Sequence, residues 1–545
     1  MTRYRCGWTP SDPGFLLPLA MRIPCLLRTS ALRASAVLIG LTGPLLRGGE
    51  PLVVVLEPTG QTLATRTALY GQNVTSGDWH GSTQRKRGPI LWDAVAGRPD
   101  PAWDELSHAY PLRVVRYHTG NIYPWRDAVG PVEERKPILD ESGSTLDKGV
   151  GLQEFLRWLE TLPDHPEAAL IASPFRPTGE LADLVAYCNA RTGPMAELRA
   201  AHGHAAPYGV KYWELGNETD WFNRDDLDIT RAETEREKKH KLLVGEYVER
   251  CRERIEAMRA VDPSIKIFAH AQTAPWPVST PQWRAWHRAV LRGIGSEIDG
   301  IVIHPYYDGY SVPYVLDSVD MLIADIHELA PAGHKISVIV NEHARWVNYK
   351  IMAERPQSWG LQGAISTGDF LLRGMARPEI AMANYWCYLH RGPWRVLNAD
   401  WEDGGEHKFG TGIHWLFKVL NDAALPRYEL LTPEPPGANY AAAKSYPYTV
   451  TAGLFSDSNT DTRVLVAVNR SADEAARLTL PASFAPTSGK LKFSVVTGES
   501  LTATNVTATP DAVTLQTTVI EAEPDAASGV LHLELPARSV ASWRW

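Results

Sequence analysis

Short apolar runs alternate with longer helical stretches from about residue 68 to residue 390. We predict that eight of these runs are strands: 67–71, 113–117, 168–173, 210–215, 265–270, 298–304, 336–341 and 380–386. Helices are predicted between them, for example over 152–162 and in the charged run 231–260, where apolar residues recur at three- and four-residue steps. Strand–helix alternation repeated eight times predicts an α/β fold, a (β/α)₈ TIM barrel.

The pattern changes after about residue 425, where the proline-rich stretch 430–440 is typical of a linker. Short alternating segments follow and are predicted to be strands: 463–469, 476–481, 490–496, 512–516, 529–536 and 539–545. Strands at such turn-separated intervals predict a C-terminal β-sandwich. The predicted domains are an extension at 1–50, a strand segment at 51–66 that is a candidate edge strand of the sandwich, the barrel at 67–424 and the sandwich at 425–545.

The N-terminus resembles a processing segment. Arg22, Arg28 and Arg33 precede the apolar run 34–46, which is too short to span a bilayer as a helix. This arrangement fits the hydrophobic region of a secretory signal peptide and predicts a secreted or periplasmic protein. The alternatives are a translation start at Met21 and an N-terminal tail with an accidental apolar patch.

Composition excludes several classes of partner. The chain has 545 residues, enough for two or three domains, and a formal net charge of −8, which gives no indication of nucleic acid or membrane as a partner. The five cysteines are scattered without a CxxC pair, so buried free thiols are expected. No His/Cys cluster has zinc spacing, so we expect no metal site. We also expect no cofactor, because the two carboxylates described below would do the bond making and breaking. Oligomeric state is left open.

Two glutamates follow predicted strands in similar surroundings. Glu218 comes after Asn217 and the strand 210–215, while Glu342 comes directly after the strand 336–341. These are the fourth and seventh predicted strands, and the carboxyl ends of barrel strands converge on one site. Two such carboxylates are what a retaining glycosidase needs, one as acid/base and one as nucleophile.

The two glutamates would have different roles, and Glu218 also has a non-catalytic interpretation. A general acid needs a raised pKa, so we expect one at Glu218, and Asn217 is suited to hydrogen-bond a sugar hydroxyl. Glu214, inside the same strand, is expected to be a buried structural partner. The alternative is that Gly-Asn forms a turn and leaves Glu218 on the surface.

The chain resembles the glycoside hydrolases of clan A, and within that clan it is most similar to family 51, the α-L-arabinofuranosidases. The segments that carry this resemblance are 114–135, 182–190, 210–221, 301–307, 336–346 and the C-terminal sandwich. In the first segment, the residues that match the family are Arg116, Gly120, Asn121, Trp125, Asp127, Gly130 and Pro131.

The resemblance implies roles for individual residues. Glu218 would be the acid/base and Glu342 the nucleophile. Tyr306 would hydrogen-bond the nucleophile, His304 would orient the site near the acid/base, and Arg116 would pair with the nucleophile carboxylate and keep it ionised. The alternatives are satisfied core polar groups for the histidine and tyrosine and a structural ion pair for the arginine.

Two departures from the family lie where the terminal sugar would bind. Asn73 stands near the position of a family glutamate that holds the terminal arabinose, and His118-Thr119-Gly120 replaces a Pro-Gly-Gly turn. The pair of carboxylates is intact while these sugar-recognition positions differ. Four tryptophans at or just after strand ends are candidates for stacking on sugar rings or for core packing: Trp125, Trp221, Trp346 and Trp386.

The sequence therefore predicts a retaining glycoside hydrolase that acts by double displacement on a polysaccharide or oligosaccharide. The resemblance implies an α-L-arabinofuranosidase. The alternatives within the clan are a β-xylosidase, a β-glucosidase and an endo-glucanase. A non-catalytic carbohydrate-binding protein is the alternative of a different class.

Overall fold

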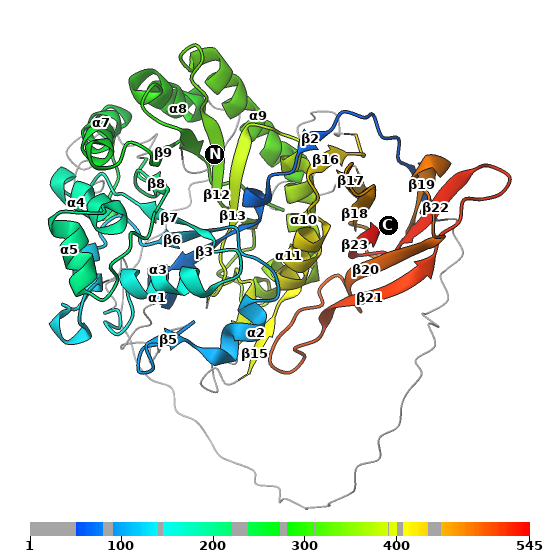
Figure 1. Cartoon of the computed structure of the whole chain (residues 1–545). Coiled ribbons are helices and arrows are strands. Elements are labelled where there is room, and N and C mark those ends of the chain that lie inside the picture. The colour runs from blue at the N-terminus through cyan, green and yellow to red at the C-terminus, as the bar shows by residue number, and fades with distance from the viewer. Residues whose placement is uncertain are drawn as a thin grey trace, which may run out of the picture. The chain divides into compact units, whose positions relative to one another are not determined.

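The computed structural model describes residues 51–79, 91–139, 145–220, 238–272, 281–308, 311–390, 392–399, 407–433 and 448–545. Eight parallel strands form a closed barrel: β3 (Gly71–Thr75), β6 (Val114–His118), β7 (Glu167–Ile171), β8 (Tyr212–Glu214), β9 (Lys266–His270), β10 (Gly300–Val302), β12 (Ser337–Arg345) and β13 (Ile380–Tyr385). Each strand pairs with its neighbour in the chain, and β13 pairs with β3 to close the ring (Figure 1). The predicted TIM barrel is confirmed.

Helices surround the barrel strands: α3 (Leu152–Thr161), α4 (Thr178–Asn189), α5 (Pro194–Ala201), α7 (Val244–Val261), α8 (Pro281–Ile294), α9 (Val312–Leu329), α10 (Leu361–Met375) and α11 (Gly412–Ala423). Shorter elements accompany the strand ends: α1 (Ser76–Trp79), β4 (Trp92–Asp93), β5 (Arg98–Pro99), α2 (Asp104–Ser107), β11 (Tyr306–Tyr307), β14 (Leu397–Ala399) and β15 (Lys408–Gly410). Within the described residues, no helix combines the length and the apolar character needed to cross a bilayer.

Side-chain alternation builds two layers inside the barrel. The lower layer is apolar and contains Val114, Ala169, Phe268, Val302, Ile339 and Met382. Since side chains two residues apart on a strand point to the same face, the next inward positions lie one layer closer to the carboxyl ends. Those positions are largely polar and include Arg116, His270, His304, Asn341 and Asn384, all of them buried. The apolar layer thus supports a polar layer at the carboxyl ends of the strands.

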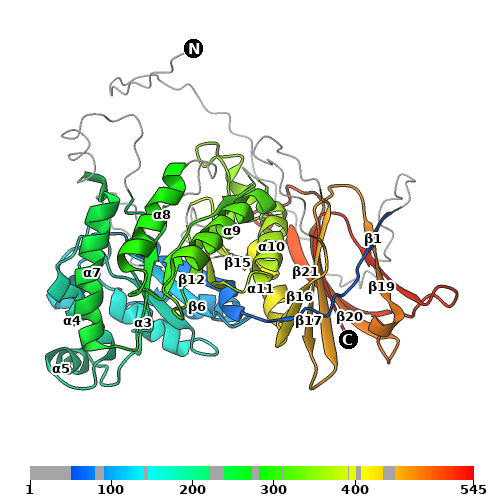
Figure 2. The same cartoon turned by 90° about the horizontal axis from the view of Figure 1, so that it is seen from above.

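The C-terminal part of the chain forms two sheets. A seven-stranded sheet has the order β2 (Leu63–Ala64), β16 (Arg427–Leu430), β17 (Val450–Asp457), β18 (Thr462–Asn469), β23 (Ser539–Arg544), β20 (Lys490–Gly498) and β21 (Val513–Glu521). A three-stranded sheet has the order β1 (Leu52–Val55), β19 (Ala476–Pro481) and β22 (Val530–Leu535). Apolar side chains from both sheets form one core, which confirms the predicted β-sandwich. Figure 2 shows α10 and α11 beside the sandwich strands.

Several predicted elements need correction. The run 67–71 is a 3₁₀ turn over Thr67–Tyr70, and the first barrel strand is the next segment, Gly71–Thr75. The helix predicted over 231–260 begins at Val244, and its residues 231–237 lie outside the described part of the chain. Strand β16 reaches Leu430, where a linker was expected, while 434–440 lie outside the description. The predicted signal segment and the whole of 1–50 also lie outside it, and the domain boundaries stay predictions.

Three of the five cysteines fall in described segments. Cys188, Cys251 and Cys387 are buried thiols that form no disulfide, as expected. Burial raises the pKa of the Cys188 thiol, so this group is a small apolar core residue, not a nucleophile.

Candidate active site

A single arginine organises the polar layer of the barrel. Arg116 is fully buried on β6 and donates to Glu214 through Nε at 2.5 Å and Nη2 at 2.9 Å. Nη2 also donates to Asn217 Oδ1 at 2.7 Å, while Nη1 donates to Asn73 Oδ1 and Glu342 Oε1, each at 3.0 Å. These five hydrogen bonds match the five N–H groups of a guanidinium, so its orientation is fully determined. Arg116 therefore links the surroundings of both predicted catalytic glutamates.

The turn after β8 aims Glu218 at the site. Gly216 and Glu218 have positive φ angles of 87° and 48°, and the second is costly for a residue with a side chain. Asn121 holds the turn from the side, accepting from Asn217 N at 2.9 Å and donating to Asn217 O at 2.7 Å. Lys241 donates to the Glu218 carbonyl oxygen. These contacts hold the strained turn and direct its carboxylate into the barrel.

Glu342 lies within β12, which continues to Arg345 because the short strand β11 pairs with its last residues. The expected strand end at 341 is therefore wrong by four residues. The Glu342 side chain is nearly buried and accepts from Arg116 on Oε1 and from Tyr306 OH on Oε2 at 3.0 Å. His118 Nε2 lies 3.9 Å from Oε1. The hydrogen bonds from arginine and tyrosine hold the carboxylate in a defined orientation.

His304 stands between the two glutamates. Its Nδ1 lies 3.0 Å from Glu218 Oε1 and 3.7 Å from Glu342 Oε2, and its Nε2 lies 2.9 Å from Asn341 Oδ1. One carboxylate oxygen of each glutamate and one His304 nitrogen all lie within 4.8 Å of one another. Retaining glycosidases hold their two carboxyl groups about 5–5.5 Å apart, whereas inverting enzymes separate them by about 6.5–9.5 Å. Two carboxylate oxygens this close to each other favour the shorter, retaining separation over the inverting one.

The protonation state of this group corrects one expectation. Burial raises the pKa of Glu218, but the hydrogen bond and charge of His304 outweigh it and bring the pKa down to about 2. Burial lowers the pKa of His304, but Glu342 and Glu218 together raise it above its usual value. The raised pKa expected at Glu218 is therefore wrong for the free protein, in which the pKa of this carboxyl is lowered and the pKa of the His304 imidazole is raised.

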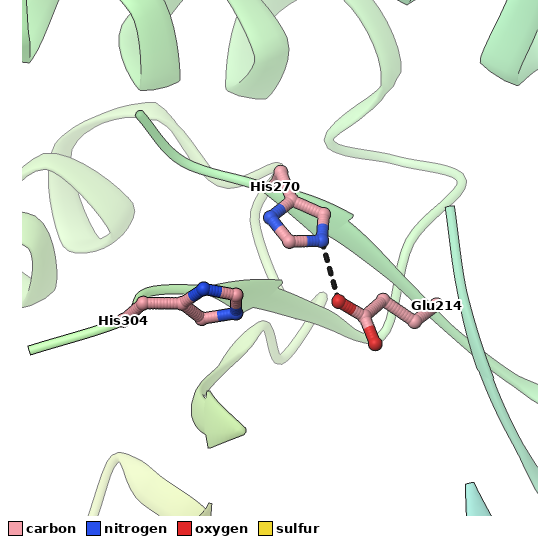
Figure 3. A group of neighbouring side chains, drawn as sticks. All are labelled: Glu214, His270 and His304. Atoms are coloured by element: carbon pink, nitrogen blue, oxygen red, sulfur yellow. Dashed lines mark hydrogen bonds and ion pairs between the residues drawn. The ribbon is translucent and has the colours of Figure 1, made fainter. Parts of the chain in front are cut away.

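Glu214 and His270 form a second buried pair next to this group. His270 Nε2 lies 2.5 Å from Glu214 Oε1 and 2.8 Å from the Gly216 carbonyl oxygen. Figure 3 shows the His270 ring directed at Glu214, while the His304 ring lies almost perpendicular to it, with centroids 5.4 Å apart. Burial raises the pKa of Glu214, but Arg116 and His270 hold it well below its usual range. Glu214 is the buried partner that its place in the strand predicts.

Among the described residues, two sets of side chains have the spacing of metal ligands. They are Glu214, His270 and His304, and Glu218, His304 and Glu342. In the first set, the carboxylate already pairs with the Arg116 guanidinium and with His270. A metal ion there would have to displace that arginine, so the donor set fits a paired carboxylate and not a metal centre.

The remaining predicted residues divide between the site and its support. Asn73 is fully buried, and its amide nitrogen donates to the Asn341 carbonyl oxygen at 2.8 Å, so it braces the barrel and does not face a sugar. Trp125 is 2 % exposed, and its ring lies under the Arg126 guanidinium at 4.7 Å. Trp386 is half-buried and packs edge-on against His118, with ring centroids 4.8 Å apart, on the side of the nucleophile.

The other two tryptophans predicted to lie near strand ends are Trp346 and Trp221. Trp346 is 41 % exposed and packs edge-on against Tyr306, with ring centroids 5.8 Å apart. Trp221 lies outside the described residues. The structure thus brings Arg116, Glu218, His304, Tyr306 and Glu342 together, with Asn217 and Trp386 at the edge. The roles of all these residues stay predictions.

Sequence reasoning missed His270 as a site residue. It stands at the end of a predicted strand, as His304 does, and that position was a usable signal. Lys241 was also missed, and no local pattern marks it, because it reaches the site across an intervening segment.

Comparison with known proteins supports the same reading. Residues 113–290 match the family model of the α-L-arabinofuranosidase 1 domain. The chain is 32% identical over 261 residues to the intracellular exo-α-(1→5)-L-arabinofuranosidase 1 of Bacillus subtilis (strain 168), covering 44% of this chain and 48% of the relative. It is 29% identical over 270 residues to the corresponding Streptomyces lividans protein, covering 46% and 38%. The resemblance to glycoside hydrolase family 51 is confirmed.

Solved structures agree on the fold. The family 51 α-L-arabinofuranosidase of Thermotoga petrophila RKU-1 superposes with a TM-score of 0.71 at 16% identity, covering 90% of this chain and 99% of that chain. The family 51 α-L-arabinofuranosidase of Bifidobacterium longum gives 0.69 at 20% identity, covering 91% and 97%. The matched region of this chain spans less than half the length of the two curated relatives described above.

The comparison contradicts the predicted location. Four of the curated bacterial relatives are named intracellular, which overturns the expectation of a secreted or periplasmic protein. An apolar run after arginines is a weak signal by itself, because its composition alone does not distinguish a signal peptide from another terminal segment.

Proposed function

We propose that the protein is a retaining glycoside hydrolase that removes terminal α-L-arabinofuranosyl residues from a carbohydrate substrate. The single observation that carries this proposal is the group formed by Glu218, His304 and Glu342, with donor atoms within 4.8 Å. The curated relatives named as exo-α-(1→5)-L-arabinofuranosidases support the choice of sugar and linkage. Their intracellular names favour short arabino-oligosaccharides over intact polysaccharide as the substrate.

In the first step, a Glu342 oxygen bonds to the anomeric carbon and the glycosidic C–O bond breaks. Glu218 gives its proton to the departing oxygen, so that an alcohol leaves. Arg116 and Tyr306 hold the nucleophile with hydrogen bonds of 3.0 Å to separate oxygens. This fixed orientation lowers the entropic part of the barrier.

Glu218 has to carry a proton for that step. In the free protein the lowered pKa of Glu218 and the raised pKa of His304 favour a proton on the imidazole over one on the carboxylate. A sugar that covers the half-exposed Glu218 removes water from the pair, and desolvation favours the neutral forms of both groups. The proton then moves from His304 Nδ1 to Glu218, which makes the acid at the moment of binding.

In the second step, Glu218 accepts a proton from water. The water oxygen bonds to the anomeric carbon as the bond to Glu342 breaks. The product has the stereochemistry of the substrate, and the original protonation state of the pair is restored.

Two features support a sugar pocket that differs in detail from the usual family pattern. The buried Asn73 bonds backbone carbonyl oxygens through its amide nitrogen and the Arg116 guanidinium through its amide oxygen, so its amide is already engaged and does not act as a replacement for a sugar-binding glutamate. His118, against Trp386 and 3.9 Å from Glu342, stands at the first position of the family's Pro-Gly-Gly turn. Its ring supplies a hydrogen-bonding group on the nucleophile side of the pocket.

The test is hydrolysis of a panel of aryl glycosides: α-L-arabinofuranoside, β-D-xyloside, β-D-glucoside and β-D-galactofuranoside. We expect a clear preference for the arabinofuranoside in the wild type and loss of turnover in Glu342→Gln. Preference for another sugar would keep the glycosidase chemistry and refute the arabinofuranosidase assignment. Oligosaccharide binding without turnover of any member would support a binding protein. The molecular mass of the protein in solution would show whether it forms a homo-oligomer.

A further inference from the structure

A buried aspartate lies just beyond the tyrosine that holds the nucleophile. Asp308 comes two residues after Tyr306 and is only 4 % exposed. Its φ angle is +73°, a conformation that an aspartate adopts at a cost unless its surroundings hold it. Its carboxylate accepts from Ser366 of α10 and pairs with two arginines, Arg345 and Arg470. These contacts fix a strained backbone position next to the site.

The first arginine belongs to the nucleophile strand. Arg345 is the last residue of β12, three residues after Glu342, and its Nε lies 2.7 Å from Asp308 Oδ2. In the same place β11 pairs with β12, with Tyr306 opposite Ala344. The Asp308–Arg345 pair therefore joins the two chain segments that carry Tyr306 and Glu342.

The second arginine comes from the other domain. Arg470 directly follows the sandwich strand β18, is 8 % exposed, and places Nη2 3.0 Å from Asp308 Oδ1. Its Nη1 lies 3.1 Å from Asp369 Oδ2 on α10, the helix that lies between barrel strands and sandwich strands in Figures 1 and 2. Thr451 of β17 donates to the other oxygen of Asp369 at 2.7 Å. The sandwich thus reaches the segment that follows Tyr306.

These charges alternate through a buried region. Arg345, Asp308, Arg470, Asp369 and Arg373 form a chain in which each charge lies within 3.1 Å of an opposite one, and none is more than 9 % exposed. Burial lowers the pKa of Arg470, but Asp308 and Asp369 raise it above its usual value. A buried pair that loses one partner is strongly destabilised, because the other charge stays buried without compensation.

We propose that Arg470 of the sandwich is a positioning residue for the active site, which acts through Asp308 to keep Tyr306 and Glu342 in register. The inference rests on the proposed function, because it assigns a role in that same reaction. If Arg470 has this role, the sandwich domain contributes to the catalytic rate through the position of Tyr306 and Glu342. A displacement of about 1 Å at reacting groups lowers rates by about 100-fold, so the expected effect on kcat is large.

The test compares kcat and KM of four proteins on an aryl α-L-arabinofuranoside, well below their unfolding temperatures. They are the wild type, Arg470→Met, Arg470→Lys and the control Arg477→Met. Arg477 lies in the same sandwich, 2.7 Å from Glu534, but both partners are largely exposed. We expect Arg470→Met to lower kcat by about 10- to 100-fold with little change in KM. Arg470→Lys keeps the positive charge but not the two-nitrogen contact with both aspartates, so it should recover part of this loss, and Arg477→Met should match the wild type.

A lower unfolding temperature in Arg470→Met with an unchanged kcat would overturn the proposal, because it would mean a structural role alone. An equal loss of kcat in Arg477→Met would also overturn it. If Arg470→Met does not fold, Asp308→Asn takes its place, because it keeps the shape of the side chain while removing its charge, and the same loss of kcat is expected. A wild type that hydrolyses none of the aryl glycosides would instead refute the proposed function, so the two failures are distinguishable.

Discussion

Replacement of Glu214 by glutamine tests how much the buried charges of the site contribute to folding. Glutamine has nearly the shape of glutamate, so the variant removes a charge without opening a cavity. It leaves Arg116 with one carboxylate in place of two, and His270 with a weaker partner. All three side chains are at most 2 % exposed, so solvent cannot replace the lost interaction.

The expected loss of unfolding free energy in Glu214→Gln follows from the burial of the ion pair. Loss of one partner from a buried ion pair costs about 3–5 kcal/mol. For a barrel of roughly 350 residues, the entropy of unfolding is on the order of 0.7 kcal/mol per kelvin, so the unfolding temperature should fall by about 4–7 °C. Glu534→Gln is the matched control, since that glutamate pairs with Arg477 at 2.7 Å but is 58 % exposed. The control should lose less than about 1 kcal/mol.

The effect also has a predicted pH dependence. Arg116 and His270 hold the pKa of Glu214 below its usual value against the opposing effect of burial. A depressed pKa contributes stability that is present above the unfolded pKa, about 4.3, and is lost as the pH falls toward the folded pKa. The difference in unfolding temperature between wild type and Glu214→Gln should be constant from about pH 5 to pH 8 and shrink below about pH 4. Differential scanning calorimetry across this range checks it. A variant as stable as wild type at pH 7, or an undiminished difference at pH 3, would refute the reasoning.

Three further substitutions probe the catalytic group. Tyr306→Phe removes a hydrogen bond to a charged acceptor, worth about 1.5–3 kcal/mol, so kcat on an aryl arabinofuranoside should fall by about 10- to 150-fold with the fold intact by circular dichroism. Glu218→Ala should lose more kcat/KM on substrates with poor leaving groups than on activated ones, because only the former need a proton; equal losses would contradict an acid role. His304→Asn should lower the unfolding temperature most below about pH 6.5. A raised folded pKa gives stability that is present there and is lost as the pH rises through it, and a pH-independent difference would contradict the pairing with Glu218.

The carboxyl ends of the strands were the predictable part of the site. Glu218, His304 and Glu342 each follow or end an apolar run of the right length, and a barrel brings such positions together whatever their spacing in the chain. The position of Arg116 could also be predicted from the sequence, because it lies on the inward face of its strand, two residues after the buried Val114. The period of two along each strand thus predicted which side chains meet.

Polar strands and long-range contacts were not predictable in the same way. The first barrel strand, Gly71–Thr75, is fully buried but contains glycine, glutamine, asparagine and threonine, so hydrophobicity pointed to the preceding run instead. Asn73 appeared to face the sugar because its position along the chain fits that role. Its amide is instead directed at carbonyl groups of β12 and β13, which only closure of the barrel brings near. The lowered pKa of Glu218 likewise depends on a histidine 86 residues away.

The most direct test of the central claim is the chemical identity of the nucleophile. The acid/base variant Glu218→Ala should react with an activated aryl α-L-arabinofuranoside, release the phenol in a burst and then turn over slowly. Peptide mass spectrometry of the quenched protein should find one pentosyl group on the peptide that contains Glu342 and on no other. A labelled carboxylate elsewhere, or unlabelled protein together with a product of inverted configuration, would contradict a double displacement at Glu342.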